Sequence, residues 1–118
     1  MSVIIPISIG ELYDKYSILQ IKMKKLKGDK LAFVQKEIDY LKPFIYLYPV
    51  DYKELKKINE LLWEIEDAIR VKEISQEFDQ EFIELARSVY LTNDKRYSLK
   101  MKINLFYPSD VMEMKSYI

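Results

Sequence analysis

Four times along this chain, apolar residues recur every three or four positions between residues that start or stop a helix. The clearest run, from Ile9 to Leu26, follows a capping box made by Ser8 and Glu11 and is followed by Gly28. Apolar side chains at this spacing line one face of a helix, and such a face must be buried against another. The pattern therefore predicts an all-α fold in which several helices pack together.

Three more helices are predicted from the same signals. Apolar residues from Leu31 to Leu41 indicate a second helix, which Pro43 ends because the residue before a proline disfavours helical geometry. A third helix is expected from Asp51 to about Glu73, and a fourth from Asp79 toward Asn104. With 118 residues and short connections, we expect one domain over residues 1–118, an antiparallel bundle of about four helices.

The two ends of the chain carry a different pattern. Val3 to Ile7 is a short β-branched run, and Pro6 within it confines such a segment to the edge of a sheet. After Pro108 the sequence VMEMKSYI alternates apolar and polar residues, as a half-buried strand does. We therefore predict that the N-terminal and C-terminal segments pair as a short two-stranded ribbon beside the helices.

Composition narrows the chemistry that is open to the chain. It contains no histidine and no cysteine, which excludes Ser-His and Cys-His triads, so we expect no catalytic residue, no metal and no cofactor. Basic and acidic residues balance at 19 each, which argues against nucleic acid as a partner. No apolar run reaches the ~20 residues that span a bilayer, and no signal peptide begins the chain, so we predict a cytoplasmic protein without membrane contact.

Charged residues on the inward faces of the last two helices are the most informative feature for function. On the fourth helix the apolar face turns polar halfway along, at Asn93, Arg96 and Lys100. On the third helix Glu66 and Glu73 lie close to the apolar stripe in the same way. A polar seam is therefore expected inside the bundle.

Two interpretations of this seam stay open. Internal ion pairs, of Glu66 or Glu73 with Arg87 or Arg96, would fix the register of the two helices. Alternatively, the cations form a pocket for phosphate or carboxylate, and an aromatic ring beside them, that of Trp63, Tyr90 or Tyr97, stacks on a base or sugar. The candidate ligand-binding residues of that pocket are Trp63, Arg70, Arg87, Tyr90, Asn93, Arg96 and Lys100.

A third interpretation is catalytic. Glu64 with Asp67, and Glu81 with Glu84, are spaced to share a helix face and to hold Mg²⁺, as in the all-helical nucleotide pyrophosphohydrolases. In that family, however, the ExxE motif precedes ExxD, which is the reverse of the order found here. Ordinary solvated charge explains these acids better, so we expect a protein that is not an enzyme.

Other features point toward a second subunit. Ile18 and Ile21 lie off the main stripe of the first helix, which suits a central position or burial against a second copy, and we favour the second copy. The stretch from Pro43 to Tyr52 is aromatic and must be covered, by the bundle itself or by a partner. The chain is also basic from Lys15 to Lys30 and acidic from Glu60 to Glu84, and such blocks neutralise each other within a fold or across a dimer. We therefore predict a homo-oligomer.

Several stretches together carry a family resemblance: GELYDKYSIL, NELLWEIEDAIRVKE, FDQEFIELARSVYLTNDKR and KSY. The chain resembles a small family of bacterial and viral proteins classified as a domain of unknown function. Some bacterial relatives are similar to segments associated with surface-polysaccharide glycosyltransferases, which implies a sugar-nucleotide or phosphosugar context. The positions that match are Asp14, Lys15, Asn59, Trp63, Glu66, Asp67, Arg70, Lys72, Glu73, Arg87, Tyr90, Asn93, Asp94, Arg96 and Lys100.

The first hypothesis for function is a non-enzymatic binder of an anionic small molecule, a nucleotide, cyclic nucleotide or nucleotide sugar, which it sequesters. The alternative is a protein-interaction or scaffolding module, accessory to a polysaccharide glycosyltransferase, in which the seam is purely structural. A Mg²⁺-dependent nucleotide hydrolase is the third.

Overall fold

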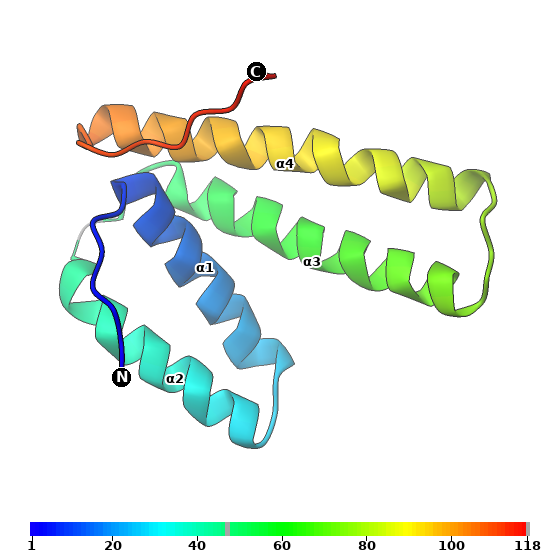
Figure 1. Cartoon of the computed structure of the whole chain (residues 1–118), viewed down its shortest axis with the longest axis horizontal. Coiled ribbons are helices and arrows are strands. Elements are labelled where there is room, and N and C mark those ends of the chain that lie inside the picture. The colour runs from blue at the N-terminus through cyan, green and yellow to red at the C-terminus, as the bar shows by residue number, and fades with distance from the viewer. Residues whose placement is uncertain (47, 118) are drawn as a thin grey trace.

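The computed structural model describes residues 1–46 and 48–117. All regular secondary structure within these residues is helical. Four α-helices and one short 3₁₀ helix follow one another: α1 (Ile9–Lys25), α2 (Asp29–Leu41), η1 (Lys42–Phe44), α3 (Tyr52–Ile74) and α4 (Gln80–Phe106). Figure 1 shows two helical hairpins, α1 with α2 and α3 with α4, which diverge from a common end. The predicted all-α bundle is confirmed.

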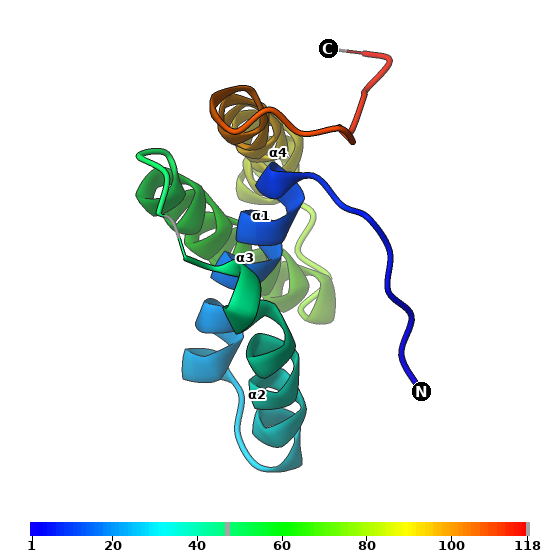
Figure 2. The same ribbon diagram turned by 90° about the vertical axis from the view of Figure 1, so that its left-hand side faces the viewer.

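The predicted two-stranded ribbon is wrong, since the described residues contain no strand. The ends of the chain meet at one point, where the Ile9 amide donates to Ser109 Oγ at 3.0 Å, and then separate (Figure 2). The C-terminal segment uses its polar groups on α4, because the Tyr97 hydroxyl donates to the carbonyl oxygen of Glu113 at 3.2 Å. Contacts with a helix surface replace the ladder that an alternating pattern alone suggested.

The helix ends follow from local sequence. Ser8 Oγ accepts the Glu11 amide at 3.0 Å at the start of α1, and Asp79 Oδ1 accepts the Phe82 amide at 3.0 Å at the start of α4. At the end of α3, Gln76 adopts a left-handed φ of 54°. The Gln76 and Glu77 amides then reach back to carbonyl groups of the last turn, which is a Schellman motif with glutamine where glycine is usual.

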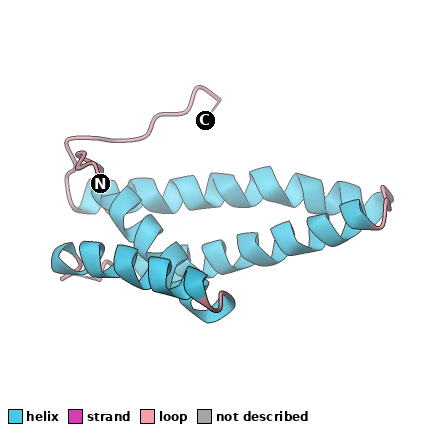
Figure 3. Cartoon of the chain, turned by 60° about the horizontal axis from the view of Figure 1, so that its bottom comes forward, coloured by secondary structure: helices cyan, strands magenta, loops and turns pink. Residues whose placement is uncertain are grey.

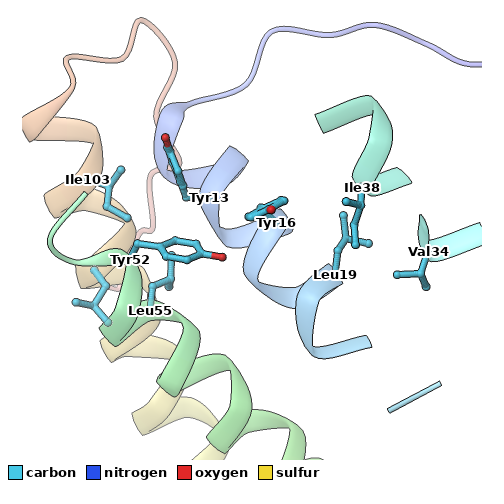
Figure 4. Packing of buried hydrophobic residues seen from close by; sticks show 9 residues of the cluster. Tyr13, Tyr16, Leu19, Val34, Ile38, Tyr52, Leu55 and Ile103 are labelled. Atoms are coloured by element: carbon cyan, nitrogen blue, oxygen red, sulfur yellow. The ribbon is translucent and has the colours of Figure 1, made fainter. Parts of the chain in front are cut away.

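Helix α1 is the centre of the fold, because α2, α3 and α4 all pack against it. Its Tyr13, Tyr16 and Leu19 lie in one core with residues of every other α-helix (Figure 4). Ile21 is 3% exposed within the single chain. The second apolar side of α1 is therefore explained by its central position, and our preference for a second copy at this face was wrong.

Tyr52, at the start of α3, joins the two hairpins. It is buried, its hydroxyl donates to Gln20 Oε1, and its ring lies edge-on to Tyr13 and Tyr48 at centroid distances of 5.7 and 5.5 Å. Burial above all, with neighbouring tyrosines, raises the pKa of Tyr52. Within the stretch from Pro43 to Tyr52 the bundle thus buries Tyr52 and Pro49. Phe44, Tyr46 and Tyr48 stay exposed in the single chain, contrary to the expectation that the whole stretch is covered, and Leu47 lies outside the described residues.

Candidate functional site

Close approach of α1 to α4 creates the most polar interior of the molecule. A Cβ atom on Gly10 would lie 2.5 Å from the Lys100 carbonyl oxygen, so only glycine fits there without a shift of backbone. The Gly10 amide donates to Oδ1 of the buried Asn104 at 2.6 Å. This contact sets the first turns of α1 directly against the polar half of α4.

Asp14 is the centre of the network that results. Its side chain is 1% exposed, and its carboxylate receives a two-pronged contact from Arg96: Nε donates to Oδ1 at 2.9 Å and Nη2 donates to Oδ2. Asn59 of α3 donates to Asp14 Oδ1 at 2.9 Å and to Ser17 Oγ at 2.8 Å. One buried carboxylate therefore ties α1 to both helices of the other hairpin.

Lys100 is the second cation beside Asp14, and unlike the half-buried Arg96 it is buried. Only 7% of the residue is exposed, and its Nζ lies 2.8 Å from Glu11 Oε2, 3.1 Å from Glu113 Oε2 and 3.8 Å from Asp14 Oδ2. Burial is the largest single influence and would lower the pKa of Lys100. The hydrogen bonds to Glu11 and Glu113 and the charge of Asp14 together outweigh it and raise that pKa. Lys100 is thus held in its charged form.

Lys100 lines a cleft of about 290 Å³ between α1, α4 and the C-terminal segment. Its walls are Glu11, Asn93, Arg96, Tyr97, Lys100, Glu113 and Lys115. The Lys115 ammonium lies 5.2 Å from the centre of the Tyr97 ring, a cation–π distance. The Asn93 side chain is half-buried and has no hydrogen-bond partner in the described part of the chain. The cleft therefore holds three cations, one unused amide and one aromatic ring.

Of the predicted site residues, the structure brings together Asn93, Arg96 and Lys100. Arg70 lies far along α3, where its Nη2 is 3.6 Å from Glu66 Oε2 and its side chain is 75% exposed. The others do not line the cleft: Arg87 and Tyr90 are exposed on α4, and Trp63 is half-buried on α3.

The internal ion pairs have partners that the sequence did not suggest. Arg96 pairs with Asp14 of α1 and not with Glu66 or Glu73 of α3, which are exposed or half-exposed. A signal for Asp14 was present, because Asp14, Ser17 and Ile21 are spaced to share the second side of α1. No comparable signal marks Glu113, which reaches the cleft from outside the helices.

The carboxylates proposed for Mg²⁺ lie apart from this cleft. Glu64, Asp67, Glu81 and Glu84 are all exposed. Among the described residues, no group of three or more acidic side chains lies close enough together to hold a metal ion. None of the helices in that part of the chain combines the length and apolar character that crossing a bilayer requires.

Stability is expected to fall at alkaline pH. Lys100 and Tyr52 both have a raised pKa in the folded chain, whereas an unfolded chain releases these protons from about pH 10 upward. Above about pH 10 the folded state then binds more protons than the unfolded state. The free energy of unfolding is therefore level near neutrality and falls as the pH rises above about 10. Urea unfolding followed by circular dichroism, at steps from roughly pH 8 to pH 11, measures the slope.

Tyr52→Phe provides the matched variant for this slope. It keeps the ring in the core and removes the phenol that titrates, so the fall above pH ~10 becomes shallower, while Lys100 still contributes. An identical slope in both chains, or a stability that rises with pH, contradicts the assignment.

A family model described as a family of unknown function, DUF6165, matches residues 3–118, and the chain belongs to that family. Neither a curated protein nor a solved structure matches the chain.

Proposed function

We propose that this DUF6165 protein binds an anionic small molecule in the cleft beside Lys100, and that it holds the molecule without cleaving it. The observation that carries the proposal is the pairing of Lys100 with Glu113. Lys100 is kept charged at 7% exposure, yet the Glu113 side chain that pairs with it is 46% exposed and belongs to the segment after α4. An external phosphate or carboxylate can take the place of that one carboxylate.

The remaining groups of the cleft favour the same chemistry. Arg96 uses Nε and Nη2 on Asp14, which leaves Nη1 as a further donor at the cleft wall. Lys115 and the amide of Asn93 add donors from two other positions. Once Glu113 is displaced, the cations outnumber the carboxylates that remain, so the cleft attracts an anion.

Size and shape narrow the class of ligand. Pockets for small molecules commonly measure roughly 300–1,000 Å³, and this cleft, at about 290 Å³, lies at the lower end. A mononucleotide, a cyclic mononucleotide or a sugar phosphate suits that volume better than a nucleotide sugar. Tyr97 offers one ring face for stacking on a base or sugar once Lys115 turns toward the phosphate.

Glu113→Gln is expected to strengthen binding of the anion by about tenfold, because it removes the carboxylate that competes for Lys100. The fold itself changes little, since a half-exposed ion pair contributes only about 0–1 kcal/mol. Isothermal titration calorimetry with inorganic phosphate, a mononucleotide and a cyclic mononucleotide, each without Mg²⁺, measures the affinities of both chains.

Two further variants serve as controls. Lys115→Ala is expected to weaken binding of the anion. Arg87 is an exposed arginine of α4 outside the cleft, so Arg87→Ala is expected to leave the affinity for the anion unchanged. Weaker binding by Glu113→Gln, or no binding of any of these anions, contradicts the proposal. Product formed from a nucleotide when Mg²⁺ is added would instead favour the hydrolase.

A scaffolding module is the second candidate. The observation in its favour is the aromatic surface after α2, where Phe44, Tyr46 and Tyr48 are 62%, 77% and 62% exposed. If the anions fail to bind and substitutions in this surface abolish association with a partner protein, the cleft is purely structural and this candidate replaces the first.

A further inference from the structure

The far half of the α3–α4 hairpin, residues 66–91, is an arm that leaves the body of the protein (Figure 3). Every residue of this arm is described, and none of them is buried. The radius of gyration of the chain is 16.0 Å, whereas a compact domain of this length has about 13.5 Å. The chain is therefore less compact than a domain of its length, and the unburied arm is one cause.

The exposed area gives the scale of this deficit. The chain exposes 8530 Å², whereas a compact monomer of its mass exposes about 6,800 Å². The excess of about 1,700 Å² is more than the ~800 Å² per partner that a standard protein interface covers. The arm shares this excess with the exposed N-terminal residues, among them Met1, Val3 and Ile4, and a second protein surface of ordinary interface size would cover about half of it.

One face of the arm continues the face that α1 covers. On α3, Asn59 bonds to α1, and residues three and four positions apart carry the same face outward through Trp63, Glu66, Arg70 and Glu73. On α4, Arg96 bonds to α1, and the same spacing leads outward through Asn93, Val89, Ala86 and Phe82. We call this uncovered continuation the distal face. It is apolar along α4, and along α3 it carries two carboxylates, Glu66 and Glu73, against one guanidinium, that of Arg70, which lies 3.6 Å from Glu66. Its net charge is therefore negative.

Charges of opposite sign lie in the other hairpin. The arm carries seven acidic residues against three basic ones, and the turn between α1 and α2, residues 22–30, carries five lysines against one aspartate. Lys22, Lys24, Lys25 and Lys27 form no ion pair among the described residues. Lys24 and Lys25 share a small cleft with Glu60 and Glu64 of their own chain, but no salt bridge joins them. This basic turn is therefore available to a further acidic surface.

We propose that the distal face of one copy binds the basic turn of a second copy, and that the two copies form a two-fold dimer with both contacts made reciprocally. Pairing of arm with arm would place acidic surfaces together, which electrostatics opposes. Pairing of arm with turn joins opposite charges, and in a two-fold dimer each chain supplies both halves of the contact. The partner's turn takes the position on the hairpin that α1 takes nearer the body.

Reversal of charge tests the contact without disturbing any core. Light scattering after size exclusion is expected to give wild-type chain a mass near twice 14.2 kDa. Lys24→Glu with Lys25→Glu, or Glu66→Lys with Glu73→Lys, weakens dimerisation at least tenfold. Glu81→Lys with Glu84→Lys, which reverses two exposed acids of the arm that lie off the distal face, changes it less than threefold. Circular dichroism checks that each variant keeps its helix content.

Mixing the two charge-reversed chains gives the decisive result. Each alone places like charges at both contacts and is expected to stay monomeric, whereas the mixture matches opposite charges at both contacts and forms a heterodimer. A monomeric wild-type chain at every concentration up to the millimolar range overturns the proposal. A dimer that resists both reversals, or a mixture that stays monomeric, overturns it equally.

Discussion

Asp14→Ala is expected to destabilise the protein by about 3–5 kcal/mol, as the loss of one partner of a buried ion pair does elsewhere. Asp14 is 1% exposed and receives both prongs of Arg96 and the amide of Asn59. Alanine leaves the guanidinium half-buried without its carboxylate, and Lys100 loses a counter-charge at 3.8 Å. Urea unfolding followed by circular dichroism measures the change in the free energy of unfolding.

The exposed pair of Glu66 and Arg70 supplies the matched control. Its atoms lie 3.6 Å apart with side chains 47% and 75% exposed, so Glu66→Ala costs the single chain, measured below the concentration of dimerisation, about 0.5 kcal/mol or less. A double variant, Asp14→Ala with Arg96→Met, is expected to cost less than the sum of its single changes, because the two residues act as one unit. Equal costs for Asp14→Ala and Glu66→Ala would show that the buried network adds no more than a surface pair.

Local signals in the sequence were sufficient to predict the helices. Ser8 and Asp79 cap helices α1 and α4, because this effect depends on residues within one turn. Helix α2 ends close to Pro43 as predicted, but Lys42 keeps a helical backbone and starts the 3₁₀ helix η1, so the predicted reason for this end was wrong. The ribbon failed for the converse reason. A period of two in residues 111–118 states which side chains alternate, and it does not state whether a strand or the side of a helix lies beside them.

For the polar seam, periodicity predicted which residues lie inward but not which residues they contact. The periodicity of α4 predicted that Arg96 and Lys100 lie on an inward face, and both contact carboxylates of α1 there. It did not say which helix they meet, because Asp14 is 82 positions away in the chain. The second side of α1 was the missing evidence. Together, Asp14, Ser17 and Ile21 mark the face of α1 that α3 and α4 cover, so Ile21 is buried within its own chain.

The location of the core explains why polar groups are concentrated at one end of the hairpin. All buried residues of α3 lie from Tyr52 to Ile65, and those of α4 lie from Thr92 to Asn104. The remainder of each helix is exposed or half-exposed. The free energy that holds the chain folded therefore comes from the region around α1, and the arm contributes little of it within a single copy.

Leu55→Ala is accordingly expected to destabilise the protein by about 2–5 kcal/mol, through lost burial and the cavity that remains. Leu55 is 0% exposed and belongs to the core shared with Tyr13 and Tyr52. Leu61 is its matched control, since it is the same residue type on the same helix but 43% exposed. Leu61→Ala is expected to change the free energy of unfolding by about 0.5 kcal/mol or less.

Urea unfolding at a protein concentration below that of dimerisation compares the two leucine variants in the single chain. A large difference locates the stabilising contacts beside α1, where the Asp14 network also lies. Losses of similar size at both positions would mean that the outer side of α3 is packed as tightly as the core.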